Sequence, residues 1–333
     1  MKEILIITLL IIGALIGAGF ASGQEIYSFF YSYGNLGILG ILITCFLISI
    51  IIYKTLNLIY KNNINNYDEF LKIFIKNSKI TNIISKILNI LLLVSFYIMI
   101  AGFGAYFEQE MGVNHLIGSL ILAILTGIIF FTSVKGVLKV SEMVVPILLI
   151  FIIFIGGMNL LTLGENINLL ETKKGWLLSS IIYSSYNMVL LIPTLISIKN
   201  QITKKNNIKY ISIFCGMIMS IMFIFIYMLL IKIDIDISSL EMPVVYAIRK
   251  FFPKYRIAYA FIILASIFTT AISLGIGFLQ NICKNRTSYP HIVLFMCITS
   301  LIISNLGFSK LVNLLYPTFG YIGILQILCI LLT

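Results

Sequence analysis

Ten apolar segments, each close to 20 residues long, recur along the 333-residue chain. About 20 consecutive apolar residues are needed for an α-helix to cross the hydrocarbon core of a bilayer. Only 11% of the residues are charged and 60% are hydrophobic, whereas soluble domains carry about 25% charged residues. The sequence therefore predicts an all-α polytopic membrane protein with ten spans: Ile4–Phe30, Leu36–Tyr60, Ile83–Phe107, Leu116–Val134, Val140–Leu163, Gly175–Ile198, Tyr210–Ile231, Ile257–Ile282, His291–Leu306 and Leu311–Leu332.

The net charge of +11 is distributed unevenly between the connections of these spans. If the N-terminus is cytoplasmic, most of the 23 Lys and Arg residues fall in cytoplasmic connections, which is the positive-inside pattern. We therefore expect a multi-pass protein of the cell membrane with both termini in the cytoplasm. The excess charge is explained by orientation in the bilayer, so we expect no nucleic-acid partner.

The five cysteines form no CxxC pair, which argues against a disulfide framework or a cysteine metal site. No metal cluster, nucleophile constellation or phosphate-binding loop appears in the sequence, so we expect a protein that is not an enzyme. We also expect no tightly bound cofactor. The sequence does not indicate an oligomeric state.

A division near residue 165 separates the ten spans into two groups of five. An odd number of spans per group gives the two halves opposite orientations, as in transporters built from inverted repeats. We therefore expect one membrane domain over residues 1–333, with repeats of about 1–165 and 166–333. A short amphipathic helix is expected around Tyr67–Ile75 in the cytoplasmic connection. A capping helix at Pro243–Phe252 and an irregular loop are equally compatible with the connection after the seventh span.

The first span contains the stretch GALIGAGFASGQE, residues 13–25, which combines small residues with an acid. Small residues four positions apart allow two helices to pack closely. Here, however, nearly every face is small and Glu25 follows directly, which favours an unwound segment. An acid inside a span is a functional candidate as a proton relay, a cation ligand or a partner of a substrate ammonium. Capping of the helix that starts at Glu25 is the structural alternative.

The sixth span contains a second polar interruption, Tyr183-Ser184-Ser185-Tyr186-Asn187, followed by Pro193. Interrupted spans in corresponding positions of two halves indicate the binding site of a transporter. A break frees amides at one half-helix end and carbonyls at the other, which suit anionic and cationic groups respectively. We therefore expect spans one and six to be broken at mid-membrane, with a substrate between them.

Two further spans carry polar residues at helical spacing. In the eighth span Ser266, Thr269 and Thr270 offer oxygen ligands for a hard cation, although hydroxyls also bond to carbonyls of their own helix. In the third span Tyr97 and Gly102 precede two glutamates, Glu108 and Glu110, which we expect to be solvated at the outer mouth.

These motifs make the chain similar to the amino acid–polyamine–organocation superfamily, which has the LeuT-type fold. Within it, the chain most resembles the YkvI-type bacterial permeases, whose first span reads much like GAGFASGQEI and whose third ends much like IAGFGAYFEQ. The resemblance extends over essentially the whole chain. It implies a 5+5 inverted repeat and a substrate between spans one and six, with help from spans three and eight.

The resemblance also implies a sodium site. Matched onto this sequence, its ligands are the carbonyls of Gly13, Ile16 and Ser266 and the hydroxyls of Thr269 and Thr270. Some proton-coupled relatives place a lysine in this site from the fifth span, but residues 146–161 contain none. This absence favours Na⁺ as the coupling ion, while Glu25 keeps H⁺ as the alternative.

These interpretations predict a cation-coupled secondary transporter of a small amino acid or related zwitterion, working by alternating access in the lipid bilayer. A ligand-sensing membrane subunit that keeps the permease scaffold without net transport, as in germinant receptors, is the alternative. The predicted substrate-binding residues are Gly17, Ala18, Gly19, Phe20, Glu25, Tyr97, Gly102, Tyr183, Ser184, Ser185, Tyr186 and Asn187.

Overall fold

The computed structural model describes residues 2–131, 135–162, 171–282 and 288–332, and these residues form helices and no strand. The expected boundary between the two repeats, near residue 165, lies outside the described residues. The α-helices are α1 Lys2–Leu15, α2 Ala18–Ser22, α3 Gln24–Phe29, α4 Leu36–Asn62, α5 Tyr67–Lys72, α6 Ser78–Met111, α7 His115–Phe131, α8 Lys135–Leu161, α9 Trp176–Ser197, α10 Asn207–Ile231, α11 Pro243–Phe251, α12 Arg256–Ile282, α13 Tyr289–Ser304 and α14 Phe308–Leu332. Short 3₁₀ turns occur at η1 Tyr31–Tyr33, η2 Lys199–Gln201, η3 Ile237–Ser239 and η4 Pro253–Tyr255.

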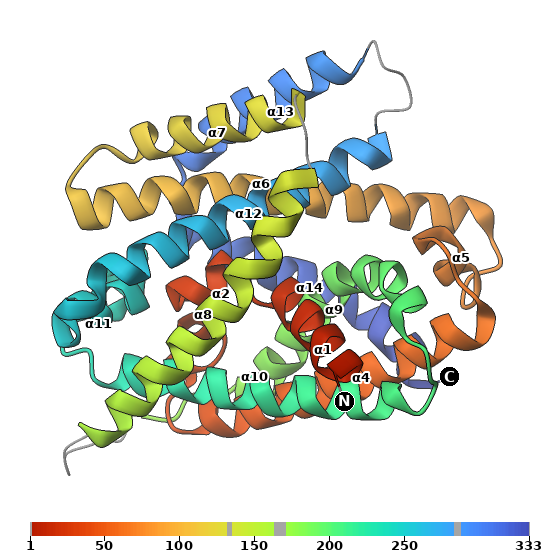
Figure 1. Ribbon diagram of the computed structural model, residues 1–333, viewed down its shortest axis with the longest axis horizontal. Helices are drawn as coiled ribbons and strands as arrows, with labels where there is room; N and C mark the ends of the chain where they lie inside the picture. The colour runs from red at the N-terminus through yellow and green to blue at the C-terminus, as the bar shows by residue number, and fades with distance from the viewer. Residues whose placement is uncertain (1, 132–134, 163–170, 283–287, 333) are drawn as a thin grey trace.

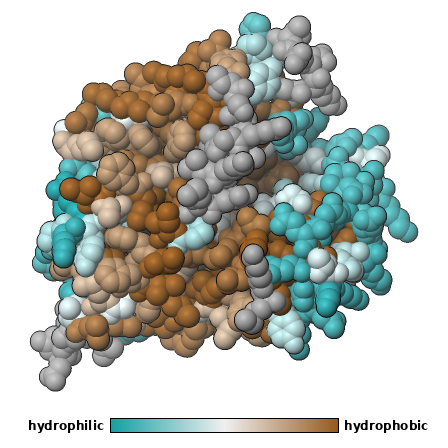
Figure 2. Space-filling model, in the orientation of Figure 1, coloured by the Kyte–Doolittle hydropathy of each residue, from teal (hydrophilic) through white to brown (hydrophobic). Residues whose placement is uncertain are grey.

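Each of the ten predicted spans coincides with a long helix or, for the first span, with the series α1, α2 and α3. Among the described residues, seven helices are long and apolar enough to cross a membrane, and three apolar helices are shorter. These helices are hydrophobic on most sides, which is typical of helices that face lipid as well as protein. Figure 2 shows hydrophobic residues over the middle of one face and hydrophilic residues toward its two ends. The chain is therefore a multi-pass α-helical membrane protein.

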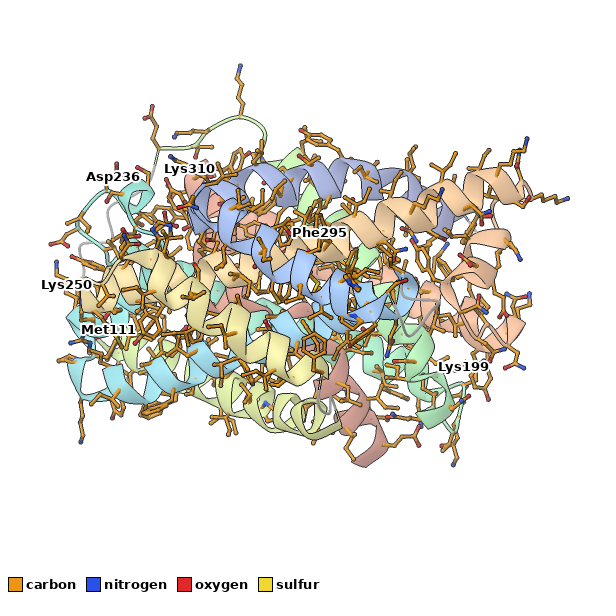
Figure 3. All side chains as sticks on the ribbon, turned by 90° about the horizontal axis from the view of Figure 1, so that it is seen from above. Met111, Lys199, Asp236, Lys250, Phe295 and Lys310 are labelled. Carbon is orange, nitrogen blue, oxygen red and sulfur yellow. The ribbon has the colours of Figure 1, made fainter. Side chains whose placement is uncertain are left out.

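The two polar ends of the bundle differ in what they carry. Helix α5 and the C-terminus lie at one end, here called the α5 end, and α11 lies at the opposite end, here called the α11 end (Figure 1). Near the N-terminus, Glu3 accepts the Thr203 amide at 3.0 Å, four residues after Lys199. Figure 3 places Lys199 at the α5 end and Asp236, Lys250 and Lys310 at the α11 end. The predicted amphipathic helix is present as α5, and the predicted capping helix is present as α11.

The long helices pack along one another in pairs. Contacts join α4 to α10 and α6 to α12, while α7 and α13 pack together on the side of α6 (Figure 1). Helix α8 crosses the bundle and contacts α1, α10 and α12. The short helices α2 and α3 lie in the interior, where they contact α12, α11, α9 and α14. This arrangement surrounds the first span with other helices, so an irregular backbone there is shielded from lipid, as a break inside a membrane requires.

The sixth span differs from the expectation, because α9 is a continuous helix from Trp176 to Ser197. The prediction that this span is broken at mid-membrane is wrong. The polar residues bond to their own helix instead: the Ser184 hydroxyl donates to the Ser180 carbonyl at 2.8 Å and the Ser185 hydroxyl to the Ile181 carbonyl at 2.7 Å. Such bonds satisfy a polar side chain without unwinding the backbone. A run of serines and asparagine is therefore compatible with an intact helix.

Candidate functional site

The first span is interrupted twice within eight residues. Helix α1 ends at Leu15, and Gly17 is extended, with φ −96° and ψ −169°. Helix α2 then runs for five residues and ends at Gly23, whose φ of +83° lies in the left-handed region that favours glycine. Helix α3 follows with Glu25 in its first turn. The predicted break of span one is confirmed at Ile16–Gly17, and Gly23 adds a second one.

Neighbouring elements hold the short helix α2 in place. The Tyr259 hydroxyl of α12 donates to the carbonyl of Ala21, and the Ser22 hydroxyl donates to the carbonyl of Gly19 at 2.9 Å. A Cβ atom on Gly23 would lie 2.5 Å from Cγ2 of Val244 in α11, so the α11 helix closes directly over the second interruption. Carbonyls that the break leaves without helix partners are thus satisfied by side chains, as buried backbone groups require.

Glu25 lies at the centre of the site. Its side chain is only 3% exposed, and its Oε2 atom accepts hydrogen bonds from the hydroxyls of Tyr183, at 2.9 Å, and Tyr186, at 2.5 Å. Both tyrosines project from α9, so these two hydrogen bonds of the carboxylate join the first and sixth spans. Its Oε1 atom lies against Gly19 of α2, because a Cβ there would be 2.3 Å away.

Aromatic rings enclose this carboxylate. The Phe29 ring packs edge-on against Tyr183, with centroids 5.1 Å apart, and stacks on Tyr186 at 5.8 Å. On the other side Tyr316 of α14 stacks on Tyr186, with centroids 4.7 Å apart. We call Glu25, Phe29, Tyr183, Tyr186 and Tyr316 the Glu25 cluster. Among the described residues, no basic side chain forms an ion pair with Glu25.

The other polar residues predicted for the sixth span, Ser184, Ser185 and Asn187, bond within α9 rather than to the Glu25 carboxylate. The Asn187 amide donates to the Tyr183 carbonyl at 3.0 Å, and the two serines bond within α9 as described above. Their carbonyls belong to an intact helix, so the expected half-helix end at Ser184–Asn187 is absent from α9. Of that run, only the two tyrosine side chains reach the Glu25 carboxylate.

Three other predicted substrate residues have packing partners elsewhere. Phe20 is fully buried and packs on Phe223 of α10, with centroids 4.8 Å apart. The hydroxyls of Tyr97 and Thr299 share a hydrogen bond of 2.6 Å between α6 and α13. A Cβ atom on Gly102 would lie 3.0 Å from the ring of Phe308, so this glycine allows close packing of α6 on the start of α14.

The predicted sodium ligands are partly brought together. The methyl carbon of Thr270 lies 3.7 Å from where a Cβ on Gly17 would be, so α12 faces the break of the first span. The Thr269 hydroxyl donates to the Ser266 carbonyl at 3.2 Å, which uses two of the predicted ligand groups on each other. Gly13 faces Val145 of α8, where a Cβ would lie 2.9 Å from Cγ1.

The α11 end carries an ionic cluster that the sequence did not predict. Glu110 was expected to be solvated, but its side chain is 1% exposed and pairs with Arg249 at 3.2 Å and Arg256 at 3.3 Å. The end of α6 is thereby attached to α11 and to the start of α12. The Gln109 side chain also bonds both the amide and the carbonyl of Met242, at 2.8 Å and 3.0 Å. The expectation for Glu110 is therefore wrong, because the arginines that neutralise it are distant in sequence.

Glu241 reaches from the loop before α11 to the beginning of α14. Its Oε2 atom accepts the Ser309 amide at 2.6 Å, so the carboxylate caps the first turn of that helix. Burial raises the pKa of Glu241, and the nearby Glu108 raises it further. A pocket of about 240 Å³ opens here, lined by Glu108, His115, Glu241 and Lys310 among others. The Ser309 hydroxyl in turn accepts the side-chain amide of Gln24 at 2.6 Å.

A second pocket of about 290 Å³ adjoins the Glu25 cluster. It is lined by residues of α3, α9 and α14 and includes Phe29, Ser179 and Asn313. Because Phe29 also packs on both tyrosines that hold Glu25, its ring separates this pocket from the carboxylate. Of the cluster, Phe29 and Tyr316 were not predicted, since a lone aromatic residue in an apolar span gives no functional signal.

No family model matches the chain. It is 27% identical over 322 residues to the uncharacterized membrane protein YkvI of Bacillus subtilis (strain 168), covering 94% of this chain and 91% of that protein. It is 25% identical over 328 residues to the uncharacterized protein YyaD of the same organism, covering 97% and 95% of the two chains. Among solved structures, the manganese transporter of Eremococcus coleocola, determined with an aromatic bis-isothiourea substituted compound, aligns over 97% of this chain and 69% of that one, at 13% identity and a TM-score of 0.49. The chain is thus a helical membrane protein similar over nearly its whole length to YkvI.

Proposed function

We propose that this protein is a cation-coupled secondary transporter of a small amino acid or related zwitterion, with the 5+5 LeuT-type arrangement of the amino acid–polyamine–organocation superfamily. The observation that carries the proposal is Glu25, a buried carboxylate beside a break in a membrane-spanning segment, bonded by two tyrosine hydroxyls and paired with no basic side chain among the described residues. A buried carboxylate without a positive partner costs several kcal/mol. Such a group favours binding of a positive charge.

The pattern of helix contacts supports an inverted repeat. The proposal equates the first span (α1 to α3) with α9, α4 with α10, α6 with α12, α7 with α13 and α8 with α14. Three contacts between the halves then have counterparts. The contact of α1 with α10 corresponds to that of α9 with α4, the contact of α8 with α12 to that of α14 with α6, and the contact of α7 with α12 to that of α13 with α6. Contacts within halves also correspond, since α8 packs on α1 and α14 packs on α9. Two structurally equivalent halves would give rise to this correspondence.

In this proposal the α5 end, with both termini, faces the cytoplasm, and the α11 end faces outward. The amides of Gly17 to Phe20 at the start of α2 bind the substrate carboxylate, because the first amides of a helix have no partner within it. The continuous α9 contributes its tyrosine side chains rather than a half-helix end. The substrate lies between the break and α9, and alternating access moves these two elements relative to each other.

The proposal includes sodium as one candidate for the coupling ion. Its proposed ligands are the carbonyls of Gly13, Ile16 and Ser266 and the hydroxyls of Thr269 and Thr270, of which Thr270 faces Gly17 in the break of the first span. Substitution Thr270→Val removes the hydroxyl and keeps the shape. If the site is used, this variant needs a higher sodium concentration for half-maximal uptake. Unchanged sodium dependence removes this ligand set from the proposal.

The test of the function is transport by purified protein in proteoliposomes. A panel of labelled amino acids and related zwitterions is offered in counterflow, which needs no ion gradient, and then with sodium and proton gradients imposed separately. The proposal expects saturable counterflow of at least one compound and its accumulation under one of the gradients. Specific ligand binding without any flux would instead support the ligand-sensing alternative. Asp234→Asn, at an exposed carboxylate on the α11 end, serves as the control with wild-type transport.

A further inference from the structure

The space around the two oxygens of Glu25 limits which positive charge the carboxylate can bind. Oε2 accepts both tyrosine hydroxyls, at 2.9 Å and 2.5 Å. Oε1 faces Gly19 so closely that a single added carbon there would be 2.3 Å away. An ammonium group needs room for a tetrahedral head of several atoms, and a metal ion needs several oxygen ligands. A proton adds no volume to the site.

The groups that face this carboxyl from the neighbouring helices are neutral. Helix α9 contributes Tyr183 and Tyr186, and α14 contributes Tyr316. Behind Tyr183 lies the thiol of Cys45 in α4. Helix α2 contributes Gly19 and α3 contributes the Phe29 ring. Helix α10 contributes Phe223, which packs on Tyr183 with centroids 5.5 Å apart. No described lysine, arginine or histidine is among these groups.

Two hydroxyl donors compensate only part of the cost of burying this charge. A hydrogen bond to a charged group returns less free energy than the transfer of a carboxylate out of water costs, even after the protein relaxes. Binding of one proton removes the charge without any rearrangement of the rings. The occluded arrangement therefore favours the protonated form of Glu25.

Glu25 also lies where a change in its own charge can shift helices α2 and α3. It is carried by α3, of six residues, which is joined through Gly23 to α2, of five residues. Helices this short have little stability of their own and depend on tertiary contacts. The carboxyl supplies such contacts to both sides, to Gly19 of α2 and to the tyrosines of α9. Its ionisation would weaken the dry packing on which the position of α2 and α3 depends.

A chain of polar side chains leads from the neighbour of Glu25 to the α11 end. Gln24 is fully buried, its amide nitrogen donates to Ser309 at 2.6 Å, and its Oε1 atom has no hydrogen-bond partner. The Ser309 amide is bound by Glu241, which lines the polar pocket of about 240 Å³ at that end. These bonds attach the segment beside Glu25 to the polar pocket at the α11 end.

We propose that Glu25 is the coupling group of this protein and that the ion it carries is a proton rather than sodium or the substrate ammonium. The carboxylate accepts one proton from the aqueous side to which the site is open, crosses the occluded arrangement as the neutral carboxylic acid, and releases the same proton on the other side. No covalent bond to the substrate forms or breaks. This inference rests on the proposed transport function and specifies its coupling.

The test compares wild-type protein with Glu25→Gln in proteoliposomes without sodium. Glutamine keeps the size of the side chain and an oxygen that accepts the tyrosine hydroxyls, but it cannot exchange a proton. We expect the variant to retain counterflow within about threefold of wild type and to lose accumulation driven by a pH gradient. Wild type should accumulate substrate under a pH gradient, whose effective direction distinguishes symport from exchange. Asp234→Asn, at an exposed carboxylate that pairs with Lys250 on the α11 end, is the matched control and should behave as wild type.

Each outcome is decisive. Accumulation by Glu25→Gln under a pH gradient overturns the inference, and so does wild-type accumulation that needs sodium and ignores the pH gradient. If the variant does not fold, as judged by size-exclusion chromatography and thermal unfolding, proton flux by the wild type decides. A pH dye inside the liposomes must then report substrate-dependent proton movement without sodium, and no movement overturns the inference. If the wild type shows counterflow but neither accumulation under a pH gradient nor proton movement, the proton coupling is refuted and the transport function stands. If the wild type shows no counterflow, the proposed function and the coupling are both refuted.

Discussion

Two glycines near the first-span break, Gly17 and Gly19, should tolerate the same added methyl group to very different degrees. A Cβ on Gly19 would lie 2.3 Å from Oε1 of Glu25 and 3.0 Å from its Cγ and Cδ atoms. The Glu25 side chain cannot move away without giving up its bonds to the two tyrosines of α9. A Cβ on Gly17 would meet only Cγ2 of Thr270, at an ordinary contact distance of 3.7 Å.

The expected magnitudes follow from these contacts. Overpacking a filled interior costs about 1–3 kcal/mol, which corresponds to about 5- to 140-fold weaker substrate binding if the cost falls on the binding-competent state. Without a clash, alanine would stabilise helix α2 by up to about 1 kcal/mol relative to glycine at position 19. Gly17 caps α2 with an extended backbone that alanine also adopts, so Gly17→Ala should cost less than about 1 kcal/mol.

The assay is equilibrium binding of the labelled substrate identified in the counterflow panel, with thermal unfolding measured on the same samples. Gly19→Ala is expected to weaken binding at least fivefold and to lower the unfolding temperature. Gly17→Ala is expected to remain within about fivefold of wild type. Equal losses for the two variants, or wild-type affinity and stability for Gly19→Ala, would show that Glu25 is not packed against α2 in the manner described.

Three further substitutions test the surroundings. Tyr186→Phe removes one of the two hydroxyls on Glu25 and should destabilise the fold by about 0.5–1.5 kcal/mol, the range for a hydrogen bond between neutral groups; an unchanged unfolding temperature would contradict the hydrogen bond. Glu110→Gln removes both ion pairs at the end of α6 and should cost about 1–3 kcal/mol, with a smaller loss at high salt; a neutral result would mean that this attachment of α11 is not stabilising. Glu241→Gln should change the pH dependence of stability: because burial raises the pKa of Glu241 in the folded state, wild type loses stability relative to the variant as pH rises above about 4.5. Parallel unfolding curves for the two proteins between pH 4 and 7 would rule this out.

The sequence by itself determined where helices form and what environment they occupy. The ten apolar segments predicted the ten helical regions, because their length and uniform hydrophobicity leave no other structure that satisfies the backbone inside a bilayer. The short helix α5 followed from local apolar spacing, whereas the sequence was equally compatible with a helix and an irregular loop where α11 forms. The break at Ile16–Gly17 was also predictable, because the run of small residues before Glu25 favours an unwound segment. The second interruption, at Gly23 with its left-handed backbone, was not predicted.

Only the tertiary structure decided how the polar residues are used. The polar run of span six looked like a second break, but each serine found an acceptor one helical turn away, so α9 stayed intact. The partners of Glu25 lie 158 and 161 residues further along the chain, and those of Glu110 lie about as far away. Backbone conformation depends on neighbours in sequence, and hydrophobic length sets the spans. Which side chain meets a buried charge depends on how the helices pack, and that packing created the Glu25 cluster.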